Sequence, residues 1–220
     1  MLARSIQSTV MRRQPQQTRS QERVSHILTA AEALFIEVGY EQTTTRSIAA
    51  RAKVAVGTLY QFFPDKEAIL KALATRYFQA EYQLFAALHT PEAESLSLSD
   101  YVDRVIDAFD HFMNSQPGYR AVYEQLLSLM TYSAIEAIDD YEYRIVDELA
   151  AFFARLNPDL AGEQAQTIAL VVVKVVGDLL WLSASQNPEQ QRSLVAETKV
   201  LMLGYLGQHL GDRMGQGDVR

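Results

Sequence analysis

The sequence predicts an all-α protein of about nine helices. Along most of the chain, apolar residues recur at positions i, i+3, i+4 and i+7, which is the spacing of one face of a helix. Proline, glycine and helix-capping residues divide the chain into segments of helical length. Hydrophobic residues make up 48% of the 220 residues, so the chain can bury a substantial core. Together these observations favour a globular helical protein over a disordered one.

The N-terminal part of the chain changes character near Glu22. Residues 1–21 are rich in Gln, Ser and Arg and lack periodicity, which predicts a flexible basic arm. Such an arm can add phosphate contacts, but a disordered terminus is the simpler interpretation. From Glu22 onward the helical pattern begins and continues to Val38. Gly39 then ends this helix at a position where a left-handed cap is favoured.

The stretch 44–66 predicts two short helices separated by a tight turn. Thr44 or Thr45 can cap the first helix through its hydroxyl. The turn follows at residues 53–54, and Pro64 stops the second helix. Two such helices at this spacing are typical of a helix-turn-helix.

The second short helix, residues 55–62, is too short to be stable alone in water. Its large apolar residues must therefore anchor it to neighbouring helices: Leu59, Phe62 and Phe63. The residues between these anchors then face outward: Val56, Gly57, Thr58, Tyr60 and Gln61. A short outward-facing helix with small and hydrogen-bonding side chains is how a helix-turn-helix presents a recognition helix to the DNA major groove.

The stretch 22–70 resembles the DNA-binding domain of the tetracycline-repressor (TetR) family. The matching segments are Ile27–Tyr40 (ILTAAEALFIEVGY), Thr44-Thr45, Ile48-Ala49, Val54, Gly57–Tyr60 (GTLY) and Phe63–Ala68 (FPDKEA). The resemblance implies an N-terminal three-helix helix-turn-helix DNA-binding domain over residues 22–68. It also implies a C-terminal helical ligand-binding and dimerisation domain over 69–211. The glycine-rich composition of the tail at 212–220 predicts a frayed end.

The resemblance also implies which residues contact DNA. They are Thr44, Thr45, Arg46, Lys53, Ala55, Val56, Gly57, Thr58, Tyr60, Gln61 and Lys66. The hydroxyls of Thr58 and Tyr60 can donate to phosphates, and Gln61 can bond an adenine edge. Lys66 would bind a phosphate from the start of a helix that Asp65 caps. For Tyr60 the alternative is a purely packing aromatic.

Three residues depart from the family pattern. Lys53 stands where the family usually has glycine in the turn, so it must accept a positive φ at some cost. Ala55 replaces a frequent serine cap, which weakens the start of the recognition helix. Val56 replaces a frequent lysine or polar contact residue and so removes one DNA partner. These departures put the operator sequence and the affinity in doubt, not the fold.

Charge is distributed unevenly along the chain. The net charge is −7, but residues 1–66 contain nine Lys or Arg against five Asp or Glu, which gives +4. The remainder contains 11 basic against 22 acidic residues, which gives −11. A basic head on an acidic body suits a protein that contacts phosphates with one end only, although composition alone can also split this way by chance.

The body of the chain predicts six further helices, over residues 66–88, 98–114, 117–130, 133–156, 162–186 and 188–210. Residues 89–95 predict a loop with Pro91 as the breaker, and Asn187 caps the last helix. The most apolar run, residues 168–182, is shorter than the roughly 20 residues of a membrane span and carries Lys174 and Asp178. We therefore expect a core helix buried on nearly all sides, with these two charges paired to each other or across a dimer.

The family resemblance implies that the last two helices form a four-helix bundle with a second copy. The expected dimer contacts are Val172, Val176, Leu179, Leu201 and Tyr205. The resemblance also implies an effector pocket in the body. The expected lining residues are Tyr82, Phe85, Phe109, Phe112, Met113, Tyr123, Leu127 and Trp181. Apolar pockets with a few polar anchors bind hydrophobic or aromatic molecules, but such aromatic stripes are also common in helical cores.

Enzyme signatures are absent from the sequence. With no cysteine there is no disulfide, thiolate nucleophile or cysteine-based metal site. The four histidines, His26, His89, His111 and His209, lack metal-ligand spacing and predict solvated or packed side chains. No phosphate-binding glycine loop or nucleophile elbow occurs, so we expect no catalytic residue, no metal and no cofactor. No apolar N-terminal stretch reads as a signal peptide, which makes the cytoplasm the expected compartment.

The resemblance implies a ligand-responsive DNA-binding transcriptional regulator, a repressor that binds a near-palindromic operator as a homodimer. A small hydrophobic or aromatic effector would release it. The alternative is a helical protein-interaction adaptor that has lost operator binding, an interpretation that Ala55 and Val56 keep open. An enzyme built on the helical body is a more distant third.

Overall fold

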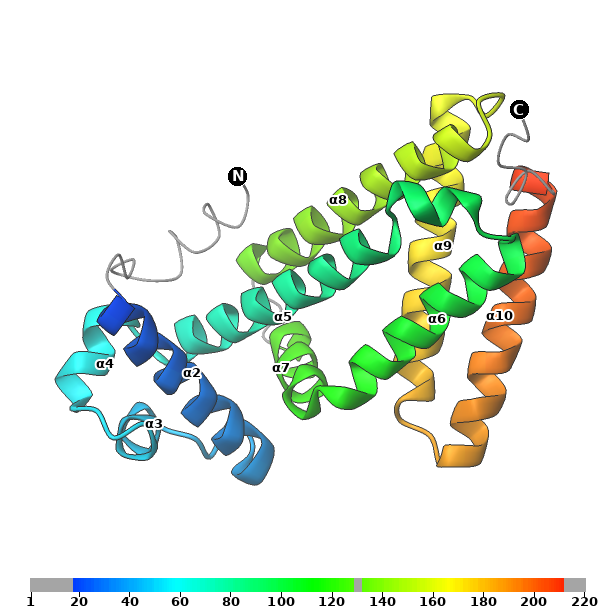
Figure 1. The fold of residues 1–220 in the computed structure, drawn as a ribbon. Helices are drawn as coiled ribbons and strands as arrows, with labels where there is room; N and C mark the ends of the chain where they lie inside the picture. The colour runs from blue at the N-terminus through cyan, green and yellow to red at the C-terminus, as the bar shows by residue number, and fades with distance from the viewer. Residues whose placement is uncertain (1–17, 129–131, 212–220) are drawn as a thin grey trace. The chain divides into compact units, whose positions relative to one another are not determined.

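The computed structural model describes residues 18–128 and 132–211, and within them it contains only helices and their connections (Figure 1). The α-helices are α2 (Thr18–Val38), α3 (Thr45–Arg51), α4 (Val56–Phe62), α5 (Lys66–Leu88), α6 (Leu98–Ser115), α7 (Pro117–Ser128), α8 (Tyr132–Leu156), α9 (Gly162–Ser183) and α10 (Pro188–Leu210). The predicted all-α class is confirmed.

Several boundaries differ from the prediction, and α9 ends at Ser183 rather than at residue 186. Helix α2 begins at Thr18, so the last residues of the predicted arm are helical, because no breaker separates them from the periodic segment. The rest of the arm, residues 1–17, and the predicted tail at 212–220 lie outside the described residues. Within the predicted loop, η1 (Pro91–Ser95) forms a 3₁₀ turn whose first residue, a proline, has no N–H to leave unpaired.

The chain divides into two compact units. The first comprises the described residues of Met1–Ala80 and Gln116–Ile138, and the second comprises those of Glu81–Ser115 and Asp139–Arg220. Helices α5 and α8 therefore each contribute residues to both units. Helix α7 belongs to the same unit as the short helices α3 and α4, and it packs on α2. The domain limits at 22–68 and 69–211 stay predictions.

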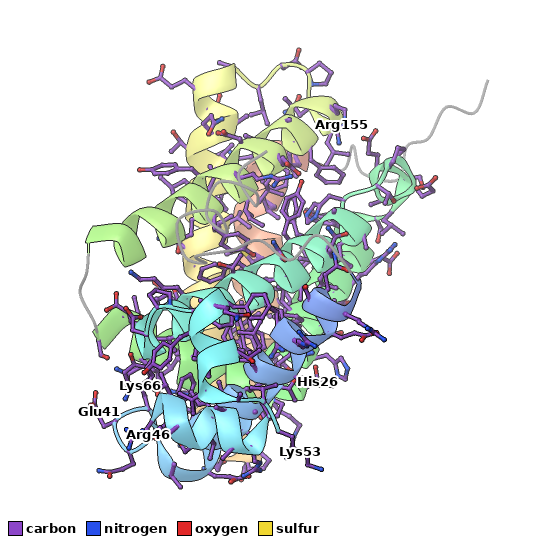
Figure 2. The ribbon with its side chains drawn as sticks, turned by 90° about the vertical axis from the view of Figure 1, so that its left-hand side faces the viewer. His26, Glu41, Arg46, Lys53, Lys66 and Arg155 are labelled. Carbon is purple, nitrogen blue, oxygen red and sulfur yellow. The ribbon has the colours of Figure 1, made fainter. Side chains whose placement is uncertain are left out.

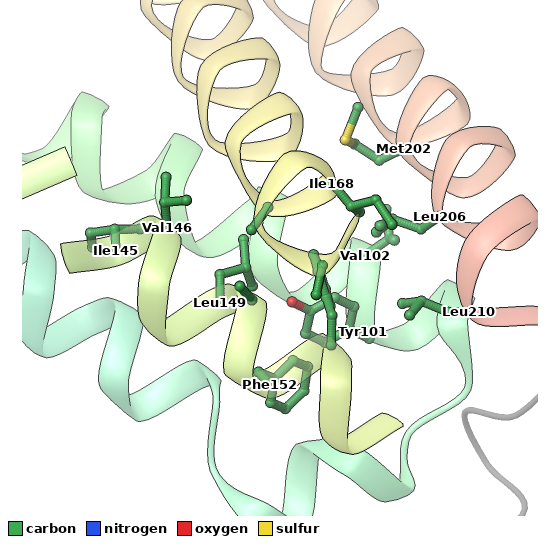
Figure 3. Packing of buried hydrophobic residues seen from close by; sticks show 14 of the residues in the cluster. Tyr101, Val102, Ile145, Val146, Leu149, Phe152, Ile168, Met202, Leu206 and Leu210 are labelled. Carbon is green, nitrogen blue, oxygen red and sulfur yellow. The ribbon is translucent and has the colours of Figure 1, made fainter. Parts of the chain in front are cut away.

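The second unit is built on the packing of α6, α9 and α10 against one another. Its buried side chains come from α5, η1, α6, α8, α9 and α10 and meet in one cluster, part of which is drawn in Figure 3. Examples are Tyr101 of α6, Phe152 of α8, Ile168 of α9 and Leu206 of α10, all of them buried. Each such side chain contributes about 1.5–3 kcal/mol by leaving water, so this cluster holds the unit together.

Helix α9 is less buried than predicted. Only one stripe, which includes Ile168 and Leu180, is buried within the single chain, while Leu170 and Leu182 are exposed. Helix α9 packs on α6 and α10, and its Gln166 and Lys174 side chains reach carboxylates of α8. Among the described residues α9 is also the one helix long and apolar enough to cross a membrane by length and composition.

The expected pair within the chain between Lys174 and Asp178 was wrong. The Lys174 ammonium forms an ion pair with Glu142 of α8, rather than with Asp178 one turn along the same helix. The reason is that the neighbouring helix brings a carboxylate from 32 residues away, which the i, i+4 spacing within α9 cannot reveal.

Candidate nucleic-acid interface

Helix α3 begins at a reciprocal cap, and this decides which of two threonines caps it. The hydroxyl of Thr44 accepts a hydrogen bond from the backbone N–H of Ser47 (3.1 Å), and the Ser47 hydroxyl accepts one from the N–H of Thr44 (3.0 Å). This capping box satisfies two backbone donors that a helix start leaves unpaired. Thr45 is the first residue of the helix, so its own hydroxyl is available for another partner.

That partner is Tyr60 on the next helix. The Thr45 Oγ1 and Tyr60 Oη atoms lie 3.0 Å apart, and either hydroxyl can donate. Tyr60 is 40% exposed, so its ring is not a buried packing aromatic. The hydrogen bond therefore holds the outer end of an exposed side chain in one place.

The turn between the two helices has the backbone conformation expected of Lys53. Its φ is +55°, the only positive value at a non-glycine among the described residues. The turn is closed by hydrogen bonds from the N–H of Lys53 to Ala50 O (3.1 Å) and from the N–H of Val54 to Ala49 O (3.0 Å). Lys53 is exposed, so its charge lies on the surface beside α4.

Helix α4 is anchored and exposed as the sequence predicts. Leu59, Phe62 and Phe63 are buried, whereas Val56, Gly57, Tyr60 and Gln61 are exposed and Thr58 is half-buried. Ala55 occupies the capping position with extended backbone but makes no side-chain hydrogen bond, which confirms the weak helix start. One side of α4 is thus fixed to the head, and the other offers small and hydrogen-bonding groups.

Arg51 has a partner that the sequence did not reveal. Its guanidinium donates to both carboxylate oxygens of Glu37 on α2, at 2.8 Å and 2.5 Å. The hydrogen bond from Arg51 holds the pKa of the Glu37 carboxyl below its ordinary value. The two residues are 14 apart on different helices, so no local spacing pattern could have found this pair.

Lys66 begins α5, and Asp65 caps that helix by accepting from the N–H of Ala68 (2.8 Å), as predicted. The Lys66 ammonium donates to the carbonyl of Tyr40 (2.6 Å) and, at a longer 3.4 Å, to that of Glu41. It also lies 4.0 Å from the centre of the Tyr40 ring, a cation–π contact. In Figure 2 the labels of Lys66, Glu41 and Arg46 lie near one another, and that of Lys53 lies apart from them.

The expected effector-contacting residues fall into both units. Tyr123 and Leu127 belong to the first unit, and the other six belong to the second. In the second unit the Tyr82 hydroxyl donates to the Glu148 carboxylate (2.6 Å and 2.8 Å), and the Arg144 guanidinium lies 3.7 Å from the Tyr82 ring centre. Phe85 is buried, Trp181 is half-buried, and Phe109 and Met113 pack against the core cluster. Their role toward an effector stays a prediction.

Residues expected at a dimer contact differ in exposure. Val172, Val176 and Tyr205 pack partly against the core of their own chain, and Leu179 is half-buried, while Leu201 is 49% exposed. The exposed apolar residues also include three that sequence reasoning missed: Leu170, Leu182 and Val200. The sequence could have indicated them as dimer contacts, because residues 170 and 182 lie about three turns apart on one helix and residue 200 adjoins the predicted contact Leu201.

His89 is a packed histidine, one of the two alternatives left by the sequence. Its Nδ1 lies 2.8 Å from the Phe85 carbonyl and its Nε2 lies 2.9 Å from the Tyr101 hydroxyl. Its ring stacks on Phe85 and meets the edge of Phe152. Burial lowers the pKa of His89 to about 4, so the imidazole is neutral at pH 7.

A three-helix head with a capped α3, a tight turn and an exposed α4 defines a helix-turn-helix DNA-binding regulator. Comparison with known protein families supports this class in both the N-terminal and the C-terminal part of the chain. The family described as bacterial regulatory proteins, tetR family, matches residues 27–73, and the tetracyclin repressor-like C-terminal domain matches residues 97–206. The chain belongs to the TetR family of bacterial transcriptional regulators.

Individual relatives are similar to different extents. The HTH-type transcriptional repressor KstR of Rhodococcus jostii is 29% identical over 162 residues, which are 74% of this chain and 70% of the relative. The HTH-type transcriptional regulator HbdR of Aromatoleum sp. is 50% identical, but over 50 residues only, which are 23% of this chain and 22% of the relative. High identity is thus confined to a short stretch.

Solved structures share the fold. GusR of Salmonella enterica superposes with a TM-score of 0.63 at 20% identity, over 84% of this chain and 95% of that chain. The SmeT–triclosan complex superposes with a TM-score of 0.62 at 22% identity, over 84% of this chain and 90% of that chain. At these identities the likeness concerns the fold alone.

Proposed function

We propose that this TetR-family regulator is a ligand-responsive repressor that binds a near-palindromic operator as a homodimer. The observation that carries this proposal is that α4 has one buried side and one exposed side. Leu59 and Phe62 are buried and fix the helix to the rest of the head. Gly57, Tyr60 and Gln61 remain exposed to solvent. A helix held in this way can enter the major groove without rearranging the head.

The exposed groups of α4 divide into two chemical roles. Tyr60, held at its hydroxyl by Thr45, would donate to a phosphate, and such contacts position a protein on DNA without reading sequence. Gln61 is exposed and carries an amide that can bond both the N6 and N7 atoms of adenine. Base specificity would then come from Gln61 with its neighbours. The position of the protein along the DNA would be set by Tyr60, Thr45, Arg46 and the rest of the predicted contacts.

A second copy supplies the other half of the proposed operator contact. The exposed apolar residues of α9 and α10, with Leu170 and Val200 among them, provide a surface for that copy. Two recognition helices about 34–36 Å apart would enter successive major grooves of B-DNA. Such a dimer reads a site with the same twofold symmetry, so the operator is near-palindromic.

We infer release by a small hydrophobic or aromatic effector. The second unit is rich in aromatic side chains with a few polar anchors, such as Tyr82 on Glu148. An effector acts by binding one of two dimer states more tightly, and its differential affinity sets how far the DNA-bound state is depleted. A regulator of this kind works where the DNA is, which for a bacterial chain is the cytoplasm.

The test is selection of duplexes from a random DNA pool by the full-length protein, followed by gel shifts. The parent is expected to enrich one preferred sequence and to bind it with an affinity that falls steeply with salt. Tyr60→Ala should weaken binding to all duplexes, whereas Gln61→Ala should relax the preference at one base pair, an effect of about 1–3 kcal/mol. Tyr143→Ala is the matched control, because Tyr143 is an exposed tyrosine of the other unit.

An adaptor without operator binding is the second candidate, because Ala55 leaves α4 without a side-chain cap and Val56 exposes an apolar group on its outer face. Selection that enriches no sequence would favour the adaptor and contradict the repressor. So would a Tyr60→Ala variant that binds the selected duplex like the parent.

A further inference from the structure

The outward-facing start of α4 is apolar. Ala55, Val56 and Gly57 are all exposed, and the surface of Val56 is 37% accessible. A Cβ atom placed on Gly57 would meet no atom within 4 Å, so the head leaves this side of the helix open. Val56 therefore offers apolar surface to a partner outside the head.

Val56 shares its side of α4 with the residues proposed to contact DNA. Side chains four residues apart lie one above the other on a helix, so Val56 is on the same face as Tyr60, and Gly57 is on the same face as Gln61. The Tyr60 hydroxyl is held 3.0 Å from that of Thr45 on α3. A helix that brings Tyr60 and Gln61 to DNA therefore brings Val56 to DNA as well.

Helix α4 itself carries no charged side chain, because its sequence is VGTLYQF. Arginine and lysine are the side chains that read guanine in the major groove, so α4 lacks that means of reading a G·C pair. The turn before α4 and the start of α3 carry the exposed cations Lys53 and Arg46. Positive charge on these flanking segments favours DNA over an apolar protein surface as the partner of Val56.

The major groove offers one group that matches an exposed valine. Base edges there present hydrogen-bond donors and acceptors, and the apolar group among them is the 5-methyl group of thymine. A valine placed against a donor or an acceptor would remove its water without replacing the hydrogen bond, which is unfavourable. Against a methyl group the same valine buries apolar surface on both sides. Valine also holds one strongly preferred χ1 rotamer in a helix, so the contact orders little that was free before.

We propose that Val56 is a specificity-determining residue that recognises the 5-methyl group of one pyrimidine in each operator half-site. The group recognised is the methyl, so thymine is preferred over uracil at this place, and 5-methylcytosine over cytosine. The proposal rests on the proposed function and deepens it. It gives the exposed apolar side chain of Val56 a role in reading sequence, in place of the DNA partner that a lysine there would supply.

Uracil tests the methyl group alone, because it differs from thymine only at C5 and keeps the O4 acceptor. On the duplex that the parent selects, each thymine is replaced by uracil in turn, at symmetric places in both half-sites. Affinity is measured at one fixed salt concentration. Burial of one methyl group is worth about fourfold in affinity, so one thymine position should lose about fifteenfold when both half-sites are changed.

Val56→Ala assigns this methyl contact to residue 56. The shortened side chain no longer reaches the methyl group, so uracil at the sensitive position should cost the variant less than about twofold, a non-additive pair of effects. Val38→Ala is the matched control, because it truncates an exposed valine of α2 in the same unit and should keep the full uracil penalty. An equal penalty in the parent and in Val56→Ala would overturn the proposal.

Cytosine and 5-methylcytosine separate the methyl group from the rest of thymine. With a C·G pair at the sensitive position, the parent should bind the methylated duplex about fifteenfold more tightly than the unmethylated one, and Val56→Ala should bind the two alike. Equal binding by the parent would overturn the proposal, because the uracil penalty would then have another origin. A selected duplex without any uracil-sensitive position would also overturn it while leaving the proposed function intact. If the parent selects no duplex, the proposed function fails, and this inference fails with it.

Discussion

At the scale of single residues, His89 shows how burial changes a side chain's chemistry. The imidazole lies among aromatic rings and bonds a carbonyl and the Tyr101 hydroxyl, and this site favours the neutral form. Tyr101 is itself buried, which raises the pKa of its phenol, so the pair carries no charge at neutral pH. The charged groups of Arg155 and Arg104 oppose protonation of His89, and that of Glu148 favours it.

This predicts an acid-sensitive contribution to stability. The pKa of His89 is about 4 in the folded chain and about 6.5 when unfolded, so below pH 6.5 the unfolded state binds the proton first. The stabilisation is therefore present above pH 6.5 and is lost as pH falls toward 4, by about 3 kcal/mol in total. Urea unfolding of the parent and of His89→Gln at pH 7.5, 6 and 5 measures it. Parallel pH profiles for the two proteins would contradict the assignment.

Single residues also mark the limit of sequence reasoning. The positive φ of Lys53 and the uncapped Ala55 were predictable, because each departs from a pattern whose backbone geometry is known. The partners of Arg51 and Lys66 were not, because they lie 14 and 26 residues away on other elements. Contacts set by the packing of helices leave no local spacing in the sequence.

At the scale of elements, helix α4 is short and has a weak start. Ala55 has the extended backbone of a capping residue (φ −65°, ψ 142°) but no side chain that can accept a hydrogen bond. The N–H groups of its first turn must therefore be satisfied in other ways. Anchoring by Leu59 and Phe62 compensates for this, which is why the helix forms at all.

Ala55→Ser should supply the missing cap. A serine hydroxyl at this position can accept from the first-turn N–H groups and raise the free energy of unfolding by about 1 kcal/mol. Ala50→Ser is the control, because residue 50 lies inside α3, where serine lowers helix stability slightly. Chemical denaturation of the three proteins measures the effect, and equal or lower stability of Ala55→Ser would argue against an uncapped start.

Helix α7 packs on the head through its first turn. Gly118 faces Glu32 of α2, whose carboxylate accepts from the Tyr77 hydroxyl and pairs with Arg76. A methyl group at Gly118 would overlap both the Glu32 carboxylate and the Tyr77 hydroxyl. Small size at this one position therefore lets α7 approach α2.

Gly118→Ala should destabilise the chain by about 1–3 kcal/mol, because these groups must shift to admit the methyl group. Gly162→Ala is the matched control: it also lies in the first turn of a helix, but a Cβ there meets no atom within 4 Å. The free energy of unfolding in urea measures both. Equal stability of the two variants would show that α7 does not need glycine at residue 118.

At the scale of the whole molecule, α9 and α10 expose more apolar surface than a lone chain accounts for. Val200 is 63% exposed and Leu201 49%, and Leu170 and Leu182 of α9 are exposed too. The sequence predicted α9 as a core helix from its composition, but a composition cannot say which chain covers which face. A second copy that covers these faces would make α9 the buried helix that was expected.

Leu201→Arg should therefore convert a dimer into a monomer, because a buried unpaired charge at the contact is costly. Val38→Arg is the control, since Val38 is a similarly exposed apolar residue on α2, in the other unit. Light scattering after gel filtration measures the mass of each variant. If Leu201→Arg stays dimeric, or if the parent is already monomeric, the assignment of α9 and α10 as the dimer interface is contradicted.

Hydroxyl-radical footprinting of the parent on its selected duplex tests operator binding most directly, with the mass of the complex measured in the same sample. We predict two protected tracts on each duplex, centred one helical turn or about 34–36 Å apart, with two chains bound. A single tract, one chain per duplex or no preferred protection would contradict the insertion of two α4 helices into successive major grooves.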